Sequence, residues 1–425
     1  MTLAVRGAES TMTSPVIRSG KWPNILRSLV MCYAVLLPYL FTVGPQLNFA
    51  PADCCLVLVL LLAPGQLKYS KSAWTGWHVT LLLTFAAGSF ISAVRTGGLS
   101  RYELVNKDFG LLLLFLGYAA ITSAVTEWGD LRHILRAFTL SVVFLNVVAV
   151  CAFLAGYFFG IVTPLTSYGG SRLSGMLLDA NAYGGLLVVA LVICEGGSWG
   201  PAPLFRGLQL FLCRLTLGLG ILFSFSRSAW MALGLALILL CVVRSAVAVR
   251  LALAALIGGP CLLLLMGHRF LPFFEQMASR PEQVQNRLTL IRDALATIEQ
   301  YPFLGAGLGS FRLEEGAIMH NSALWFLADF GLAGIAVLIG FLGWFFVKAW
   351  EAYRLAPDEE KPMALALLLA HTAMIGLAMG IEAFYQREWW LVMALIASSS
   401  WLARSTARPK QAGGPGAYAV CRATI

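Results

Sequence analysis

Residues 134–160 read ILRAFTLSVVFLNVVAVCAFLAGYFFG, and this stretch decides the class of fold. Its charged residue, Arg136, stands near the start, and residues 137–160 carry no charge. An α-helix needs about 20 apolar residues to cross the hydrocarbon core of a bilayer. Because lipid offers no hydrogen-bond partners, the backbone groups of such a segment must bond within it, as they do in a helix. We therefore predict a membrane-spanning helix here.

Apolar runs of similar length recur on both sides of this stretch. The chain has 425 residues, of which 59% are hydrophobic and 12% charged, and its mean hydropathy is +0.78. This charged share is about half that of a soluble domain, which excludes a soluble enzyme, a secreted disulfide scaffold and a nucleic-acid-binding protein as main interpretations. The sequence predicts an all-α polytopic integral membrane protein. We expect about twelve membrane-spanning helices, at residues 25–43, 52–67, 77–94, 109–125, 134–160, 182–195, 208–225, 228–243, 249–266, 322–347, 363–381 and 389–403.

The basic residues predict how these helices are oriented. Cytoplasmic loops of membrane proteins carry an excess of Lys and Arg. Here such residues gather in the N-terminal segment and in alternate loops, for example Arg132 with Arg136 and Lys348 with Arg354. We therefore expect both termini in the cytoplasm. The net charge of +9 is interpreted as a signal of topology and of attraction to anionic membrane lipid, with no nucleic-acid partner.

This topology divides the chain into three parts. A basic cytoplasmic segment, residues 1–24, precedes the transmembrane helical domain, residues 25–403. A cytoplasmic tail, residues 404–425, follows, and we expect it to be disordered. One long loop, residues 267–321, is expected on the opposite, outer face.

Two motifs occur in this long loop. Apolar residues repeat at intervals of three and four, which predicts an amphipathic helix that could lie on the membrane surface and cover a site; they are Val284, Leu288, Ile291, Leu295 and Ile298. Further on, the run Gly305-x-Gly307-x-Gly309 has alternate glycines, which let backbone N–H groups approach an anion. The run lacks the strand–turn–helix setting of a phosphate-binding motif. We therefore interpret it as a flexible turn.

Two shorter outer loops each carry one arginine. Arg172 begins a loop of small and polar residues that includes Asp179 and Asn181, a composition that allows a tight, re-entrant turn. Arg227 stands in Phe223–Trp230, where almost nothing polar separates two apolar runs. A charge at such a depth usually faces a cavity or a partner. The alternative for both arginines is that they anchor their loops at the membrane interface.

His320 and Asn321 open the predicted span at residues 322–347, beside the densest set of polar residues in the chain. Asp329 lies nine residues after His320, and a buried carboxylate needs a partner, for which we expect an arginine of the bundle. Several arginines with one titratable base suit a ligand that carries a pyrophosphate and a hydroxyl to be activated. The residues that we expect to meet at the outer leaflet are Arg172, Arg227, Arg287, Arg292, Arg312 and His320.

At these residues the sequence resembles the O-antigen ligase and O-antigen polymerase family of bacterial inner-membrane glycan enzymes. The resemblance covers about residues 165–340 and rests on four blocks in the family's order. The blocks are Arg172-x-x-Gly175-x-x-x-Asp179-x-Asn181-x-x-Gly184; Ser226-Arg227-Ser228-Ala229-Trp230; Asn286-Arg287 with Tyr301-Pro302-Phe303-Leu304-Gly305-x-Gly307-x-Gly309-x-Phe311; and His320-Asn321 with Asp329-x-Gly331. Two positions depart from the family's pattern, which commonly has Pro at Ala180 and Glu at Asp329. The first departure implies a less rigid loop, and the second keeps the charge with a shorter reach.

The resemblance implies a glycosyltransferase that takes a glycan from a polyprenyl-diphosphate carrier at the periplasmic face of the inner membrane. It implies a metal-independent, inverting route without a cofactor. Carried over by position, His320 and Arg227 would be catalytic, Arg172, Arg287, Arg292 and Asn181 would bind the substrate, and Asp179, Asn321 and Asp329 would support them. The residues agree on one point, since no His, Cys and carboxylate cluster has the spacing of a metal site.

Three functions remain open at this stage. The first is a ligase that moves finished O-antigen onto lipid A–core. The second is a polymerase that extends O-antigen or exopolysaccharide on the growing glycan and uses the same donor. The third is a transporter or flippase of the lipid-linked glycan, which would place its charges near the bilayer midplane. We favour the ligase.

Overall fold

The computed structural model describes most of the chain. The described residues are 25–43, 47–67, 73–98, 103–167, 171–177, 179–246, 249–250, 253, 256–258, 260, 281–315 and 319–407. The predicted N-terminal segment, most of the predicted ninth span and most of the predicted tail lie outside them.

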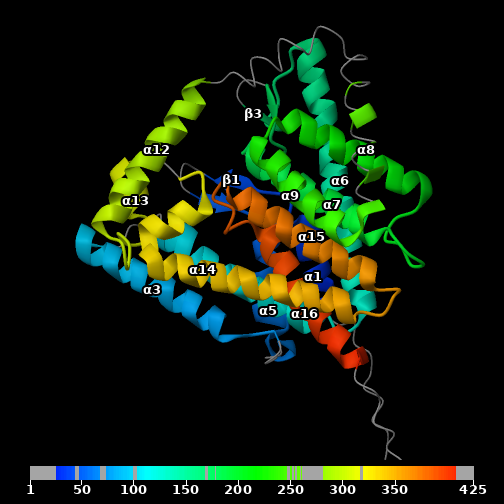
Figure 1. Ribbon diagram of the computed structural model, residues 1–425, viewed down its shortest axis with the longest axis horizontal. Coiled ribbons are helices and arrows are strands. Elements are labelled where there is room, and N and C mark those ends of the chain that lie inside the picture. Colours follow the sequence, from blue (N-terminus) through cyan, green and yellow to red (C-terminus); the bar gives the residue numbers. More distant parts are fainter. Residues whose placement is uncertain are drawn as a thin grey trace, which may run out of the picture.

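The first half of the chain forms helices joined by short connections (Figure 1). They are α1 (Ile25–Leu36), α2 (Pro51–Leu62), η1 (Pro64–Gln66), α3 (Gly76–Thr96), the π-helical turn η2 (Leu104–Phe109), α5 (Gly110–Ala124), α6 (Trp128–Phe159), α7 (Ala180–Gly197), α8 (Gly207–Ser224) and α9 (Arg227–Val243). Two antiparallel pairs of short strands lie in the connections. They are β1 (Phe41–Val43) with β2 (Leu47–Phe49), and β3 (Thr166–Ser167) with β4 (Arg172–Leu173).

The second half contains the longest helix. Its elements are α12 (Pro281–Gln300), α13 (Ser310–Glu315), α14 (Ser322–Leu355), α15 (Lys361–Ala378) and α16 (Arg387–Ala407). Helix α14 runs beside α3, and α12 and α13 lie at one end of this pair (Figure 1). Helix α12 confirms the helix predicted in the long loop.

The structure confirms an all-α polytopic architecture. Within the described residues, seven helices are long and apolar enough to cross a membrane; they are Gly76–Thr96, Leu104–Ala124, Trp128–Phe159, Ala180–Gly197, Gly207–Ser224, Ser322–Leu355 and Lys361–Ala378. Three shorter apolar helices, α1, α2 and α9, coincide with three more of the predicted spans. Helix α16 covers the last predicted span. The count of about twelve and the cytoplasmic location of both termini stay predictions.

Helices α7 and α15 form the centre of the bundle. Of the 18 residues of α7, 94% are buried, and of the 18 residues of α15, 89% are buried. Small residues allow this close packing, because a Cβ added at Gly196 would stand 2.7 Å from Cα of Ala366, and one added at Gly376 would stand 2.9 Å from Cα of Ala232. The segment at 182–195, short for a predicted span, is thus part of the central helix α7.

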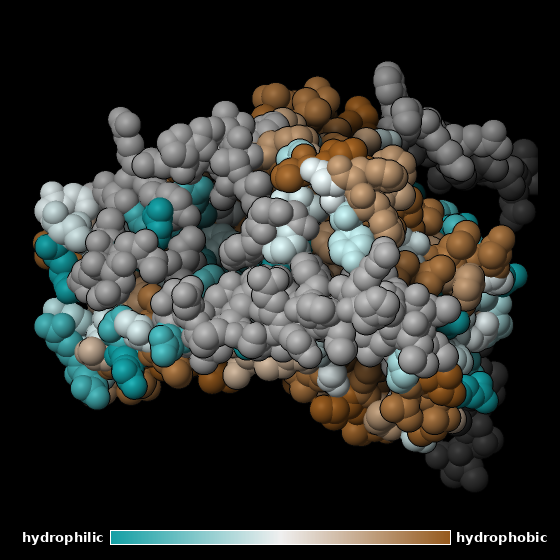
Figure 2. All heavy atoms as spheres, turned by 90° about the horizontal axis from the view of Figure 1, so that it is seen from above, coloured by the Kyte–Doolittle hydropathy of each residue, from teal (hydrophilic) through white to brown (hydrophobic). Residues whose placement is uncertain are grey.

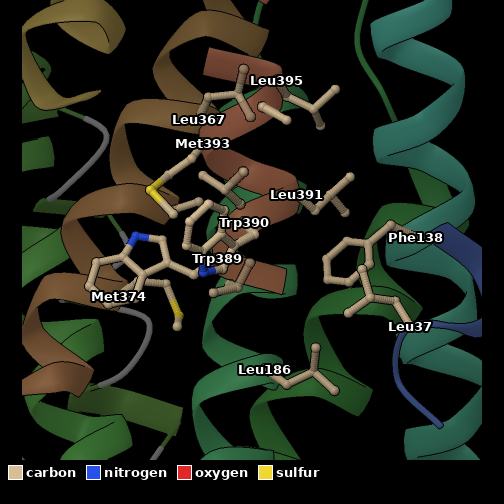
Figure 3. Close-up of a cluster of buried hydrophobic side chains, with 14 of the residues drawn as sticks. Leu37, Phe138, Leu186, Leu367, Met374, Trp389, Trp390, Leu391, Met393 and Leu395 are labelled. Atoms are coloured by element: carbon tan, nitrogen blue, oxygen red, sulfur yellow. The ribbon is translucent and has the colours of Figure 1, made fainter. Parts of the chain in front are cut away.

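The core of the bundle gathers around the first turns of α16. Trp389 and Trp390 are fully buried among leucine and methionine side chains (Figure 3). The indole N–H of Trp389 donates to Nδ1 of His371 at 2.9 Å, which satisfies two polar groups in the apolar interior. This packing fixes the start of α16, and with it the residues that precede the helix.

The outer helices expose large apolar side chains. Phe90 of α3 is 70% exposed, Phe144 of α6 is 65% exposed and Val242 of α9 is 77% exposed. Broad apolar areas are visible on the molecular surface in Figure 2. Water-facing residues of this kind would cost free energy, whereas lipid tails accommodate them. The chain is therefore a multi-pass membrane protein.

Candidate functional site

A cavity of about 530 Å³ lies where the ends of several helices meet. Its wall comes from the segment after α1, the start of α2, η2 with the start of α5, the segment before α7, His320 before α14, and the residues between α15 and α16. One part of the wall is apolar and includes Leu40, Leu56 and Leu113. The other part is polar and carries both signs of charge. The polar residues are Asp53, Asn106, Lys107, Asp179, His320, Glu382, Gln386, Arg387 and Glu388.

His320 is part of the wall of this cavity. Burial is the main cause that lowers the pKa of its imidazole, and the nearby Arg287 guanidinium lowers the pKa further. Asp179 and Glu382 act in the opposite direction and raise it. The imidazole is therefore neutral at pH 7 and can accept a proton. Of the arginines expected beside His320, Arg287 thus lies near enough to act on its imidazole, and Asp179, expected as a support, lines the same cavity.

The residues around His320 hold it in place. Asn321 caps α14, because its side-chain oxygen accepts hydrogen bonds from the N–H groups of Ala323 at 2.9 Å and Leu324 at 3.0 Å. Its amide nitrogen donates to the carbonyl of Met379 at 2.9 Å, which ties this cap to the end of α15. The hydroxyl of Ser322 accepts from the N–H of Ala383 at 2.9 Å. The start of α14 is thus fixed to the loop that carries Glu382.

Arg172 has a different place from the one we predicted for a substrate-binding arginine. It is 5% exposed, its Nε donates to the carbonyl of Ser224 at 2.9 Å, and a terminal nitrogen donates to Oδ1 of Asn181 at 2.9 Å. Asp179 in turn accepts from the backbone N–H of Asn181 at 2.8 Å and caps α7. These contacts join the strand β4, the start of α7 and the end of α8. In this arrangement Arg172 and Asn181 organise the site, and neither lines the cavity.

Two of the predicted site arginines, Arg227 of α9 and Arg292 of α12, are exposed. Arg227 is the first residue of α9, and its helix is capped by Ser226, whose hydroxyl accepts from the N–H of Ala229 at 3.1 Å. Arg292 is exposed on α12. The cavity wall includes none of the three predicted arginines Arg227, Arg287 and Arg292. Arg312, also expected at this face, forms an ion pair with Glu103 at 3.3 Å.

The middle of the predicted apolar stripe of α12, from Leu288 to Leu295, faces outward, and the side chain of Val284 lies outside the described part of the chain. Leu288 is 50% exposed, Ile291 is 38% exposed and Leu295 is 47% exposed, whereas Ala294, beside the stripe, is buried. An exposed apolar stripe is typical of a helix that lies on a membrane surface. Whether α12 covers the cavity stays a prediction.

The glycine run is a fixed turn that fills a break in α14. Gly331 has φ 67° and ψ −160°, which interrupts the helix. Backbone groups freed by this break bond to the run, since the carbonyl of Asp329 accepts from Gly307 at 3.0 Å and the carbonyl of Ala328 accepts from Ala306 at 2.8 Å. The N–H of Gly309 donates to Oδ2 of Asp329 at 2.8 Å. These N–H groups therefore already donate to protein oxygens. This argues against an anion-binding site and against the flexible turn that the sequence predicts.

Asp329 does not pair with an arginine, contrary to our expectation. Its Oδ2 accepts from the N–H of Gly309 and from the indole N–H of Trp325, the latter at 2.7 Å. The physical reason is that the broken helix brings a backbone donor to the carboxylate, and two N–H donors replace a guanidinium. Asp329 thus supports the loop that precedes His320.

Four charged residues that form ion pairs in the cavity wall were missed by the sequence analysis. Lys107 forms an ion pair with Glu382, and Arg387 forms a two-pronged ion pair with Asp53 at 2.6 Å and 2.9 Å. Each of the four lies at or beside the start or end of a predicted span on the outer side, and this position was the available signal. They were missed because they lie outside the stretch 165–340 that carries the resemblance. Within the described residues, no group of three or more His, Cys, Asp or Glu side chains could hold a metal ion.

The fold and the cavity together define a multi-pass membrane protein with a mixed polar and apolar site at the helix ends. A model of the O-antigen ligase family matches residues 212–339. This part of the chain is similar to that family, and the match supports the resemblance and a function of the general O-antigen ligase or polymerase type. The second, third and fourth sequence blocks lie inside the match, and the first, Arg172–Gly184, lies outside it. No curated protein gives a significant match to the chain.

Proposed function

We propose that this protein is a membrane glycosyltransferase of the ligase type, which moves a glycan from a polyprenyl-diphosphate carrier to a hydroxyl of lipid A–core. The observation that carries the proposal is the cavity, which His320 and Asp179 line, with the charge of Arg287 near enough to lower the pKa of the imidazole. The apolar part of the wall suits an isoprenoid, and the polar part suits a diphosphate and a sugar. The family match at residues 212–339 supports the same chemistry.

In the proposed reaction, the acceptor hydroxyl attacks the anomeric carbon of the glycan. His320 takes the proton of that hydroxyl as the new C–O bond forms, and the bond to the diphosphate breaks with its electron pair on the leaving oxygen. The products are the glycosylated acceptor, polyprenyl diphosphate and a protonated His320. Arg287, and Arg227 from the start of α9, would stabilise the leaving diphosphate. General-base help of this kind contributes about 10²–10⁴-fold.

The cavity is proposed to face the periplasm of the inner membrane. Its wall consists of the end of α1, the start of α2, the start of α5, the start of α7, the start of α14 and the start of α16. All these helix ends lie away from the cytoplasm in the topology predicted from the basic residues. The clustering of the polar groups at helix ends favours an enzyme over a flippase, which would place them near the bilayer midplane.

The decisive test uses the purified protein with a lipid-diphosphate glycan and lipid A–core, with and without EDTA. We expect His320→Ala to remain inserted and stable but to lose at least about 100-fold in glycan transfer, the lower bound for a general base. The matched control is His133→Ala, because His133 is exposed and stands at the predicted cytoplasmic end of α6, outside the cavity wall. Transfer by His320→Ala at the wild-type rate would remove His320 from the mechanism.

A genetic experiment separates ligase from polymerase. In a strain that lacks the gene, long glycan that stays unattached to lipid A–core indicates a ligase. Single repeats attached to lipid A–core indicate instead the polymerase, which uses the same donor.

A further inference from the structure

Lys107 occupies an unusual position in the cavity wall. It lies in the π-helical turn η2, Leu104–Phe109, which directly precedes α5. A π-helical turn is rare and occurs frequently at functional sites. Here the turn contributes Asn106 and Lys107 to the polar wall and Phe109 to the apolar wall.

The Lys107 ammonium is held by one carboxylate and two aromatic rings. It forms an ion pair with Glu382, and its Nζ lies 4.5 Å from the ring centre of Trp325 and 4.6 Å from that of Tyr385. Aromatic faces stabilise a cation without using its hydrogen bonds. Lys107 therefore keeps N–H donors that one carboxylate does not use up. Both side chains of the pair are largely shielded, with exposures of 12% for Lys107 and 13% for Glu382.

Glu382 also connects Lys107 to the proposed general base. Its charge acts on the imidazole of His320 and raises the pKa of that group. A carboxylate paired with Lys107 acts less strongly on the imidazole than an unpaired one, since the ammonium offsets its charge. A ligand that takes Lys107 away from Glu382 would therefore make His320 a stronger base.

The apolar wall identifies the kind of ligand. Leu40, Leu56, Phe109 and Leu113 line the same cavity as Lys107. An anion that binds Lys107 would thus lie beside a surface suited to a hydrocarbon chain. A lipid diphosphate has these two parts in adjacent positions, whereas a free phosphate or a soluble sugar has one at most.

We propose that Lys107 is a further donor-binding residue, which exchanges Glu382 for the diphosphate of the lipid-linked glycan while the first isoprene units lie on the apolar wall. This inference rests on the proposed transferase function and deepens it. The exchange couples donor binding to catalysis, because the released Glu382 stabilises the imidazolium that forms when His320 takes the acceptor proton. No bond is made or broken in this step, and the charges are conserved.

The two partners of the ion pair should respond in opposite directions. We expect Lys107→Gln to raise the KM for the lipid-diphosphate donor about tenfold, the effect of losing one charge-assisted hydrogen bond. Glu382→Gln leaves the ammonium unneutralised, so the donor KM should fall, while kcat should fall as well because His320 loses a neighbouring negative charge. Lys107→Arg keeps the charge and should keep the donor KM within about twofold. An ion pair with a purely structural role would raise or leave unchanged the donor KM in Glu382→Gln, and this result would overturn the proposal.

A matched control and a direct binding measurement complete the test. The control is Lys348→Gln, which removes the lysine of another ion pair, with Glu351 at 3.1 Å. Lys348 lies in the second half of α14, whereas the cavity lies at the start of that helix. The variant should leave the donor KM unchanged. Binding of polyprenyl diphosphate and polyprenyl alcohol to the purified wild type should differ, and Lys107→Gln should lose this preference. If Lys107→Gln is unstable, the direction of the KM change in Glu382→Gln still decides.

The outcomes also separate this inference from the proposed function. A wild-type protein that transfers glycan while Lys107→Gln retains the normal donor KM contradicts the role of Lys107 alone. A wild-type protein that prefers the diphosphate over the alcohol but transfers no glycan contradicts the transferase and leaves the Lys107 site intact.

Discussion

At the scale of single residues, the charge environment of His320 determines what this side chain can do. Burial and the Arg287 guanidinium lower the pKa of the imidazole, while Asp179 and Glu382 raise it. The net shift of the pKa is downward from the ordinary 6.5, which favours the neutral ring that can act as a base. A histidine at a helix start is often structural, and the neighbouring charges are what distinguish this one.

The pH dependence of glycan transfer should report this environment. A general base works in its deprotonated form, so kcat/KM should fall as the pH drops through the pKa of His320, below the ordinary 6.5. Arg287→Gln removes a positive charge that lowers this pKa, and the acid limb of the profile should move to higher pH. Asp179→Asn removes a negative charge that raises it, and the limb should move to lower pH. Shifts in the same direction for both variants, measured in the transfer assay, would contradict the assignment.

At the scale of elements, the broken helix α14 and the glycine run form one unit. The run has φ of 74° at Gly305, 99° at Gly307 and 76° at Gly309, all in the left-handed region that favours glycine. A Cβ at Gly307 would stand 2.5 Å from the backbone nitrogen of Ser92 on α3. The spacing of the glycines thus serves the close approach of α3, the loop and α14. This unit therefore fixes the position of the loop that leads toward His320.

A substitution in the glycine run should destabilise this unit. We expect Gly307→Ala to lower the stability by at least about 1–3 kcal/mol from backbone strain, with a further loss from the clash with α3. The melting temperature of the detergent-solubilised protein is the measurement. Gly218→Ala is the control, because nothing lies within 4 Å of a Cβ at that position of α8. Equal melting temperatures for Gly307→Ala and the wild type would show that the run tolerates a side chain.

At the scale of the whole molecule, the cavity is assembled from segments that lie far apart in the sequence. The π-helical turn before α5, the residues between α15 and α16, and the start of α14 each provide one part of its polar wall. The central helices α7 and α15 hold these ends together through close packing of small residues. The exposed apolar surfaces of α3, α6 and α9 leave the membrane as the surrounding medium.

The predicted orientation can be tested on intact cells. In a variant without native cysteines, a cysteine at the exposed Thr289 of α12 should react with a membrane-impermeant maleimide from the outside. A cysteine at Asp358, between α14 and α15, should react only after the inner membrane is opened, since its loop is predicted to be cytoplasmic. The Asp358 side chain is 91% exposed, so accessibility does not limit the reaction. The reverse pattern of labelling would invert the topology and move the cavity to the cytoplasmic face.

The sequence by itself determined the all-α membrane architecture, most of the helix positions and the resemblance to the O-antigen ligase family. These properties are local, because hydropathy and helix formation depend on neighbouring residues, and the ordered blocks lie within one continuous stretch. Tertiary structure alone decided which charges meet. Lys107 and Glu382 are 275 positions apart in the sequence, yet they form an ion pair. Arg172 is buried and donates to the carbonyl of Ser224, and Asp329 accepts from a backbone N–H in place of an arginine. Such pairings depend on how the helices pack and where they break, and a local stretch of sequence does not show which distant residues will meet.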